Sequence, residues 1–357
     1  MWRFLFLLAP TVWAAPCTTA TSTCTEWVGV PGQALRLLVY RNFPLETRNE
    51  NITRALILIH GGTRNANQQF RSALAGAFLN GALDDTMIIA PRFASNKGRQ
   101  AGNGAECHDI VALNEALWVC ETERAESWRY GGPVAGNDRV TSYDFIDEIL
   151  QKVGRKQAFP NLRAIVVAGH SGGGIFVTRY STANLVHNQL GVPVTYIAAN
   201  ATNYAYPDAL RPTRNAYPLN GAAPGYTLPV PPGTPAFLPF ADSPNCTGYD
   251  NWPYGLRNRI GYSARLTDSQ WKKQLAARPV TYLLGDMDLL PLTTGDDLSC
   301  AAYAQGPTRL ARGLAFVKYL NEGFEAHNKT AIVPLCGHND RCMFTSETAL
   351  PLLFPKP

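Results

Sequence analysis

The sequence has no hydrophobic run long enough to span a bilayer. Its most apolar stretch, residues 4–9, follows a single positive charge at Arg3 and precedes small residues that end at Ala14. A short apolar core with these flanks is typical of a secretory signal peptide rather than of a membrane anchor. We therefore expect residues 1–14 to be a signal peptide, with cleavage one or two residues later as the alternative. The mature chain is expected to be secreted and to carry no stable membrane anchor.

Runs of charge of one sign are also absent. The net charge of +5 and the pI near 8.7 come from Lys and Arg residues scattered along the chain. Scattered charge is typical of a solvated surface. The sequence shows neither a basic face nor an aromatic-basic motif of the kind that binds nucleic acids, so we expect no nucleic-acid partner.

The C-x₂-C spacing typical of zinc sites is missing, because no two of the eight cysteines are three positions apart. That absence argues against a zinc site, and no other metal site is expected. The even number of cysteines, all after the predicted cleavage site, instead predicts disulfides in an oxidising compartment. Other pairings are open, but joining the nearest cysteines closes the shortest loops. Joining the nearest cysteines gives the pairs Cys17–Cys24, Cys107–Cys120, Cys246–Cys300 and Cys336–Cys342.

Four N-x-[ST] sequons are present. Asn51, Asn245 and Asn328 are the glycosylation candidates. Asn200 follows an apolar, strand-like run, so we expect it to be buried or close to a functional site instead of glycosylated.

No linker, internal repeat or low-complexity block separates the chain into halves. Short apolar runs alternate with amphipathic stretches, which predicts strands buried on both faces with helices between them. The predicted strands cover residues 35–40, 55–59, 87–90, 164–168, 195–199, 280–284 and 331–335. The predicted helices cover residues 67–79, 142–153, 173–186, 268–277 and 307–321, with Ser142 and Asp268 as N-cap candidates. The pattern predicts one α/β domain over residues 15–357, with a mostly parallel central sheet flanked by helices.

Two irregular segments interrupt this alternation, at about residues 93–141 and 203–262. Long irregular segments in a compact domain are often functional, and the aromatic content of both argues against simple disorder. The second is rich in Pro, Gly and Tyr, and we expect it to be a cap that covers the site. A surface excursion tied down by a disulfide is the alternative.

The most informative motif is Gly-His-Ser-Gly-Gly-Gly at residues 169–174, directly after a strand-like run. The form G-x-S-x-G between a strand and a helix is typical of a nucleophile elbow, a sharp turn that exposes a serine hydroxyl. Glycines are needed there because the turn brings backbone segments close together. The motif predicts Ser171 as a nucleophile.

A serine nucleophile needs a base to take its proton and an acid to orient that base. His338 follows the last predicted strand and is the expected base, with His108 as the alternative. Asp288 follows the preceding predicted strand and is the expected acid, with the neighbouring Asp286 as the alternative. The order Ser171, Asp288, His338 is that of α/β-hydrolases.

An oxyanion hole would complete the machinery, because negative charge develops on the carbonyl oxygen during acyl transfer. The N–H of Gly172, after the nucleophile, is one expected donor. The second is expected from the loop His60-Gly61-Gly62-Thr63 after a buried strand. We expect the N–H of Gly62 there, with Thr63 as the alternative.

Together these segments resemble the α/β-hydrolase superfamily. The resemblance is carried by residues 60–66, 169–174, 285–288 and 337–338, which span nearly the whole mature chain. Within the superfamily the chain is similar to secreted fungal and bacterial serine hydrolases that are distantly similar to polyester depolymerases and feruloyl-type esterases. Asp286 departs from the pattern, because many relatives have Glu or an uncharged residue there. The resemblance implies a cofactor-free serine hydrolase with a small-molecule or polymeric ester as substrate.

The expected function is therefore hydrolysis of a carboxylic ester through an acyl-enzyme on Ser171. A peptidase or amidase could use the same three residues, because an amide leaving group can also be protonated by the base. A small-molecule biosynthetic acyl hydrolase or transferase is a further alternative. A binding protein without turnover is the alternative from another class, because fold does not imply function.

Overall fold

The computed structural model describes residues 15–98, 106–121, 124–216, 233–289 and 297–356. The predicted signal peptide, residues 1–14, lies outside the described residues, as do parts of both irregular segments. Within the described ranges, none of the helices combines the length and the apolar character needed to cross a bilayer.

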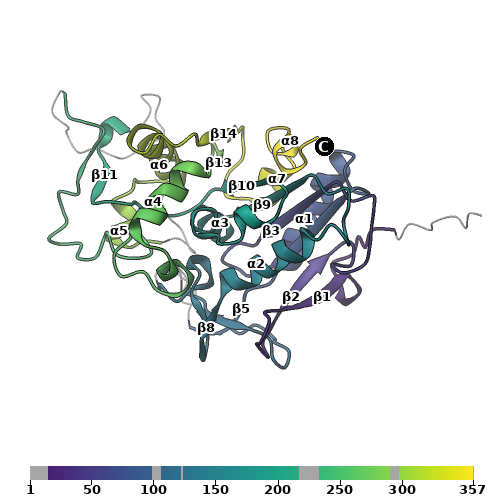
Figure 1. The fold of residues 1–357 in the computed structure, drawn as a ribbon. Coiled ribbons are helices and arrows are strands. Elements are labelled where there is room, and N and C mark those ends of the chain that lie inside the picture. Colours follow the sequence, from purple (N-terminus) through teal and green to yellow (C-terminus); the bar gives the residue numbers. More distant parts are fainter. Residues whose placement is uncertain (1–14, 99–105, 122–123, 217–232, 290–296, 357) are drawn as a thin grey trace, which may run out of the picture.

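An eight-stranded sheet forms the centre of the molecule (Figure 1). In spatial order its strands are β1 (Thr25–Gly29), β2 (Arg36–Arg41), β4 (Thr86–Pro91), β3 (Arg54–Ile59), β9 (Ala164–His170), β10 (Val194–Ala199), β13 (Val280–Gly285) and β14 (Lys329–Val333). All neighbours from β4 to β14 pair in parallel, whereas β2 and β1 pair antiparallel at one end. The prediction of a mostly parallel central sheet is confirmed. The edge strand β1 is additional to the predicted strands.

The central strands are buried on both faces, as their continuous apolar sequences predict. Along β3, every residue is buried, and successive side chains point to opposite sides of the sheet. Ile57 and Ile59 enter one hydrophobic core. Leu56 and Leu58 enter a second core on the other face. The sheet is therefore the middle layer between two apolar layers.

Helices cover both faces of the sheet (Figure 1). They are α1 (Ala66–Leu79), α2 (Ser142–Val153), α3 (Gly172–Ala183), α4 (Asp268–Ala277), α5 (Cys300–Tyr303), α6 (Arg309–Gly323), α7 (Asp340–Phe344) and α8 (Leu350–Leu353). Side chains of α1, α7 and α8 share one core with Leu56 and Leu58. Side chains of α2, α3, α4 and α6 share the other core with Ile57 and Ile59. The last helices thus pack against an element from the first quarter of the chain.

Two predicted helix N-caps are wrong by one residue. The cap of α2 is Thr141 rather than Ser142, because the Thr141 hydroxyl accepts a hydrogen bond from the backbone N–H of Asp144 in a capping box. The cap of α4 is Thr267 rather than Asp268, in a second capping box with Gln270. Both follow the spacing in which a Thr precedes an acidic or amide residue by three positions, so the sequence contained this signal.

The first irregular segment packs into the main core instead of lying on the surface. It contains β5 (Ala94–Lys97), β6 (Leu117–Val119), β7 (Pro133–Val134), β8 (Asn137–Thr141) and the 3₁₀-helix Trp128–Tyr130. Trp118 and Trp128 are almost completely buried. Trp128 stacks on Phe93, which follows β4. This segment therefore contributes directly to the layer beside α2 and α3.

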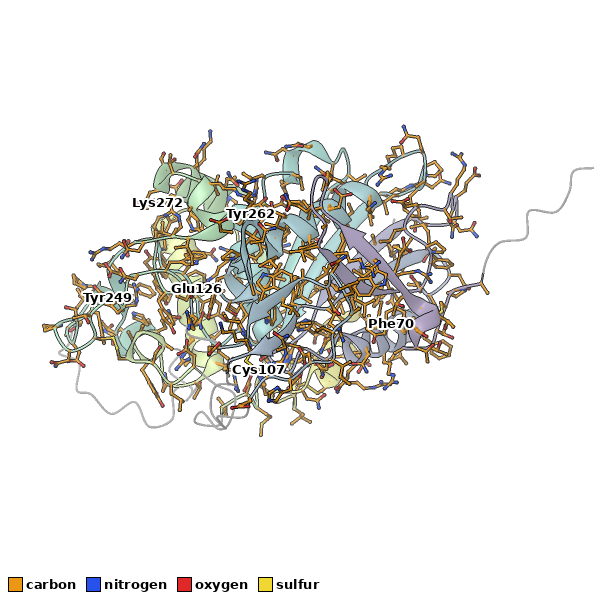
Figure 2. The ribbon with its side chains drawn as sticks, turned by 90° about the horizontal axis from the view of Figure 1, so that it is seen from below. Phe70, Cys107, Glu126, Tyr249, Tyr262 and Lys272 are labelled. Carbon is orange, nitrogen blue, oxygen red and sulfur yellow. A yellow bond between two sulfur atoms is a disulfide. The ribbon has the colours of Figure 1, made fainter. Side chains whose placement is uncertain are left out.

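The second irregular segment builds an end of the molecule beside α3 and α6. Its strands β11 (Leu210–Pro212) and β12 (Phe237–Pro239) pair antiparallel. Tyr206 packs on Phe316 of α6. Tyr249, in a small core of its own, lies at the opposite end of the molecule from Phe70 of α1 (Figure 2). That this segment covers the site stays a prediction.

The structure joins the cysteines in the four predicted pairs: Cys17–Cys24, Cys107–Cys120, Cys246–Cys300 and Cys336–Cys342. Each disulfide ties an irregular segment to itself or to a neighbouring element. The Cys107–Cys120 bridge spans the part of the first irregular segment that faces the site described below.

The sequons differ in exposure. Asn51 and Asn245 are exposed, so they remain glycosylation candidates. The prediction for Asn328 is wrong for the folded chain, because its side chain is buried and its Oδ1 accepts a hydrogen bond from Val280 N–H at 2.8 Å. Asn200 is 1 % exposed, which confirms the expectation that it is buried.

Candidate active site

The loops of interest follow five neighbouring strands. Gly62 follows β3, Ser171 follows β9, Asn200 follows β10, Asp288 follows β13 and His338 follows β14. These strands are consecutive in the sheet and parallel to one another. Their carboxyl ends therefore meet at one edge, which is where parallel α/β sheets bind ligands.

Ser171 occupies a strained turn between β9 and α3. Its backbone has φ 58° and ψ −117°, a conformation that residues with a side chain rarely adopt. Close backbone packing holds the turn: a Cβ added to Gly173 would lie 2.2 Å from the carbonyl oxygen of Ile59. The Ser171 N–H donates to the carbonyl of Ala199 at 2.9 Å. The turn presents the serine side chain at the end of the sheet.

Ser171, His338 and Asp288 form a continuous hydrogen-bonded chain. His338 Nε2 lies 2.9 Å from Ser171 Oγ, and His338 Nδ1 lies 2.8 Å from Asp288 Oδ2. The alternative acid, Asp286, has no hydrogen-bond partner for its buried Oδ1 among the described residues. The alternative base, His108, is exposed and pairs with Glu106. The geometry therefore brings together the three preferred residues and neither alternative.

The protonation states follow from the surroundings of Asp288. Burial opposes ionisation of this carboxyl, but the hydrogen bond and charge of His338, followed by the charge of Arg309, lower its pKa below the usual range. An ionised Asp288 can only accept hydrogen bonds. In the neutral imidazole, the His338 Nδ1–H then donates a hydrogen bond to Asp288, and the Nε2 lone pair accepts one from the Ser171 hydroxyl. This is the arrangement that removes a proton from a serine.

The two candidate oxyanion donors are available. Gly62 and Gly172 lie side by side, since a Cβ added to Gly172 would be 3.2 Å from Gly62 N. Within the described part of the chain, neither of these N–H groups donates to another protein group. The alternative, Thr63, is exposed at the surface of the loop. The pair of glycines fits the requirement for two convergent donors near the nucleophile.

Comparison with known proteins supports the fold. No protein-family model and no curated protein matches the sequence. Among solved structures, poly(aspartic acid) hydrolase-1 from Sphingomonas sp. KT-1 has a TM-score of 0.55 at 20% identity, over 89% of this chain and 94% of that one. LpqC, a poly(3-hydroxybutyrate) depolymerase from Bordetella parapertussis, has a TM-score of 0.52 at 18% identity, over 90% and 85%. This chain has the α/β-hydrolase fold.

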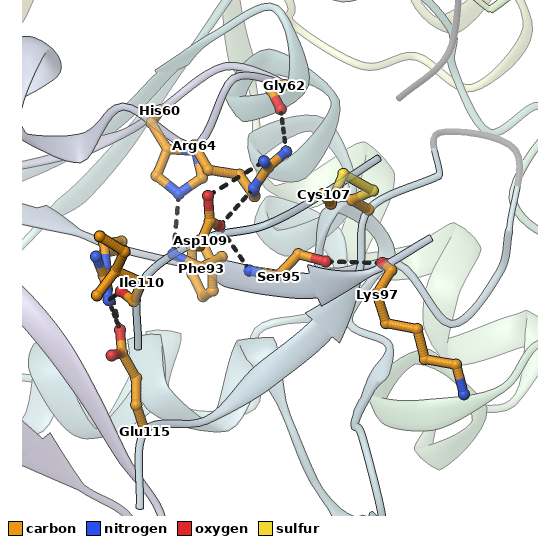
Figure 3. A network of polar contacts seen from close by, with 12 residues as sticks. His60, Gly62, Arg64, Phe93, Ser95, Lys97, Cys107, Asp109, Ile110 and Glu115 are labelled. Atoms are coloured by element: carbon orange, nitrogen blue, oxygen red, sulfur yellow. Dashed lines mark hydrogen bonds and ion pairs between the residues drawn. A yellow bond between two sulfur atoms is a disulfide. The ribbon is translucent and has the colours of Figure 1, made fainter. Parts of the chain in front are cut away.

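In this α/β-hydrolase fold, the loop that carries Gly62 is held by a partly buried polar network (Figure 3). Arg64 donates from Nε to Asp109 Oδ2 at 2.6 Å and from Nη1 to the carbonyl of Gly62 at 3.1 Å. Asp109 Oδ2 also accepts the Ser95 N–H at 2.7 Å. Arg64 and Asp109 were not predicted as positioning residues, because they are 45 positions apart and have no local motif.

His60 also supports the loop that carries Gly62. Its Nε2 accepts the Phe93 N–H at 2.9 Å, so its Nδ1–H donates to the carbonyl of Gly61 at 2.8 Å. Burial, together with the charges of Arg64 and Arg129, lowers the pKa of His60 to about 3, although its bond to Gly61 opposes the shift. His60 is therefore neutral near pH 7. Its two hydrogen bonds connect the segment after β3 to the segment after β4.

Asn200 links the other two loops of the candidate site. Its Oδ1 accepts the Gly285 N–H at 2.9 Å, and its Nδ2 donates to the Gly337 carbonyl at 3.2 Å. Gly285 ends β13 before the loop with Asp288, and Gly337 precedes His338. One amide side chain therefore fixes the spacing between the loop of the acid and the loop of the base.

Arg309 is a further residue that the sequence analysis did not identify. Its Nη1 donates to Asp288 Oδ1 at 2.7 Å, so both oxygens of Asp288 are hydrogen-bonded. Both side chains are more than nine-tenths buried. An arginine in the first turn of a helix has no local feature that predicts such a contact, because the partner lies on another strand end.

Proposed function

We propose that this chain is a serine hydrolase that cleaves carboxylic esters through an acyl-enzyme on Ser171. The observation that carries the proposal is the chain Ser171–His338–Asp288, with contacts of 2.9 and 2.8 Å. Beside it lie two backbone N–H groups that donate to no group among the described residues. A hydrogen-bonded nucleophile, base and acid with an adjacent oxyanion hole is the arrangement that acyl transfer requires.

The proposed first half-reaction forms an ester on the enzyme. Ser171 Oγ attacks the carbonyl carbon as its proton passes to His338 Nε2, and the carbonyl oxygen becomes an oxyanion held by the N–H groups of Gly62 and Gly172. The oxyanion then reforms the carbonyl and expels the alcohol, which takes the proton from His338. Asp288 stabilises the transient imidazolium and holds the ring in one tautomer.

The second half-reaction repeats these steps with water in place of serine. His338 takes a proton from water, the resulting hydroxide attacks the acyl carbon, and collapse of the intermediate returns the proton to Ser171 Oγ. The free acid leaves and the enzyme is regenerated. No external group is consumed except one water molecule per ester bond.

The setting proposed for this reaction is extracellular. The four disulfides support a secreted protein, since such bonds persist in oxidising compartments. We propose one catalytic domain from residue 15 onward, with the segment at 203–262 as a cap. A small or polymeric ester substrate accords with the poly(3-hydroxybutyrate) depolymerase LpqC, which shares the fold.

The decisive experiment is labelling of the purified chain with a fluorophosphonate, which phosphonylates activated serines. We expect one labelled residue, Ser171, and hydrolysis of p-nitrophenyl butyrate that Ser171→Ala abolishes. Ser269→Ala is the matched control, because Ser269 is exposed on α4, and it should label and hydrolyse like wild type. Labelling elsewhere, or full activity of Ser171→Ala, would refute the proposal.

Matched substrates then separate esters from amides. Methyl butyrate and N-methylbutyramide share one acyl group, so their kcat/KM ratio reports the leaving group alone. We expect the ester to be cleaved faster, and a preference for the amide would replace the proposed activity with that of an amidase.

A further inference from the structure

A buried arginine lies beside the two glycines of the candidate oxyanion hole. Arg129 belongs to the 3₁₀-helix Trp128–Tyr130 and is 3 % exposed. Its Nη1 donates to the Cys120 carbonyl at 3.2 Å and to Ser127 Oγ at 2.9 Å. Its guanidinium lies over the Trp128 ring, 4.7 Å from the centroid. These contacts fix the side chain in one orientation.

The opposite edge of the Arg129 guanidinium is unused. Among the residues that the structure describes, Nε and Nη2 donate no hydrogen bond, and no carboxylate forms an ion pair with this side chain. Burial lowers the pKa of Arg129 to about 10, so the group is still positively charged at neutral pH. A buried charge that no carboxylate neutralises is destabilising, and such a group beside a candidate site is a candidate for binding a ligand.

The unused edge of Arg129 is close to the place where the substrate carbonyl would bind. A Cβ added to Gly172 would lie 3.0 Å from Arg129 Nε, and one added to Gly62 would lie 3.1 Å from Nη2. The absence of side chains at these two positions therefore leaves room for the guanidinium against the backbone. Two guanidinium nitrogens and two backbone N–H groups, none of which donates to a described residue, therefore lie in one small region.

We infer that Arg129 binds a carboxylate carried by the acyl part of the substrate. Nε and Nη2 form the side-on edge of a guanidinium, and this edge matches the two oxygens of a carboxylate in a bidentate contact. The alcohol part of the ester must face His338 Nε2, which protonates it, and the carbonyl oxygen must face Gly62 and Gly172. The group next to Arg129 therefore belongs to the acid, so the preferred substrates are half-esters of dicarboxylic acids. This inference rests on the proposed function.

The test compares two methyl esters of similar size, methyl butyrate and monomethyl succinate, by titrating the acid released. The succinate half-ester carries a carboxylate where butyrate ends in a methyl group. We expect wild type to hydrolyse the half-ester with at least about tenfold higher kcat/KM. Arg129→Met should lower kcat/KM for the half-ester by at least about 30-fold, mainly through KM, and that for methyl butyrate by a clearly smaller factor.

Two variants serve as controls. Arg129→Lys keeps the charge but loses the bidentate edge, so it should retain part of the preference for the half-ester. Arg139→Gln removes one positive charge from the exposed strand β8 and should behave like wild type. Retained hydrolysis of methyl butyrate shows that each variant is folded.

A second measurement does not depend on turnover. Free succinate should slow fluorophosphonate labelling of Ser171 in wild type and should not slow it in Arg129→Met. Equal loss with both esters in Arg129→Met, no preference in wild type, or equal protection of both proteins would overturn the inference. Failure of the proposed function is recognised separately, because Ser171 would then not be labelled at all.

Discussion

The two sides of the candidate site are built in opposite ways. On the triad side, Ser171, His338 and Asp288 face one another through side chains, and 28 % of the His338 side chain is exposed. On the oxyanion side, the proposed chemistry belongs to the backbone of Gly62 and Gly172. The buried side chains of His60 and Arg64, with the half-buried Asp109, hold that backbone in place. Substitution of the partly exposed His338 on the triad side should remove chemistry with little effect on folding. Substitutions on the oxyanion side should affect both together.

The largest effect is expected for His338→Ala. Without a base the serine proton has no acceptor, so kcat/KM should fall by about 10⁴- to 10⁶-fold. The free energy of unfolding should change by less than about 1 kcal/mol, because the side chain is partly exposed. Ester hydrolysis and urea unfolding measure the two quantities. A large loss of stability here would contradict the contrast between the two sides.

Asp288→Asn tests the buried member of the triad side. An amide favours the wrong tautomer of His338, so kcat/KM should fall by about 10⁴-fold. Unlike His338, Asp288 also pairs with Arg309, and weakening this buried pair should lower the free energy of unfolding by about 2–3 kcal/mol. Urea unfolding of Arg309→Gln provides the matched control, because it breaks the same pair and leaves the Asp288–His338 contact in place.

Arg64→Gln tests the oxyanion side. The variant loses the ion pair with Asp109 and the hydrogen bond to the Gly62 carbonyl, so the loop should shift and kcat/KM should fall by about 10- to 100-fold. The free energy of unfolding should fall by about 2–4 kcal/mol, since the guanidinium is buried. Arg48→Gln breaks the exposed pair with Glu50 and should cost less than about 1 kcal/mol. Lost activity with unchanged stability would mean that Arg64 acts on the substrate directly.

The smallest effect is a dependence of stability on pH. The pKa of His60 is about 3 in the folded chain against a usual 6.5, so the unfolded chain binds more protons between these values. The contribution of His60 is complete above about pH 6.5 and is lost as the pH falls towards 3, by at most about 1.4 kcal/mol per pH unit. The stability difference between wild type and His60→Gln should therefore shrink from pH 7 to pH 5. His327→Gln, at an exposed position, should show no such trend.

Much of the fold could be predicted because its signals are local. The runs that became β3 and β9 are continuously apolar and that of β13 is broken only by Thr281, and each predicted boundary is within two residues of the observed one. The edge strand β1 was missed since its side chains are mostly only half-buried, which leaves no apolar run. Elements that depend on partners distant in the sequence have no comparable signal.

The same distinction applies to the site. Ser171 and Gly172 belong to a motif, and Asp288 and His338 follow predicted strands, so position along the chain was sufficient to propose them. Arg309 and Arg129 are common residue types whose importance arises only from their neighbours in space. The contact of Arg309 with Asp288 spans 21 positions, and no periodicity or turn chemistry marks it.

The buried amide of Asn200 has a consequence for producing the protein. Asn200-Ala201-Thr202 is an acceptor sequence for N-linked glycans, yet both ends of its side chain are used to join two loops. Glycan transfer to Asn200 and completion of the sheet exclude each other, because a sugar on Nδ2 does not fit in the folded chain. In a glycosylating host, pairing of β10 with β13 competes in time with the transferase. Yield of active protein then depends on which event comes first, and Thr202→Ala would remove the competition while leaving the amide in place.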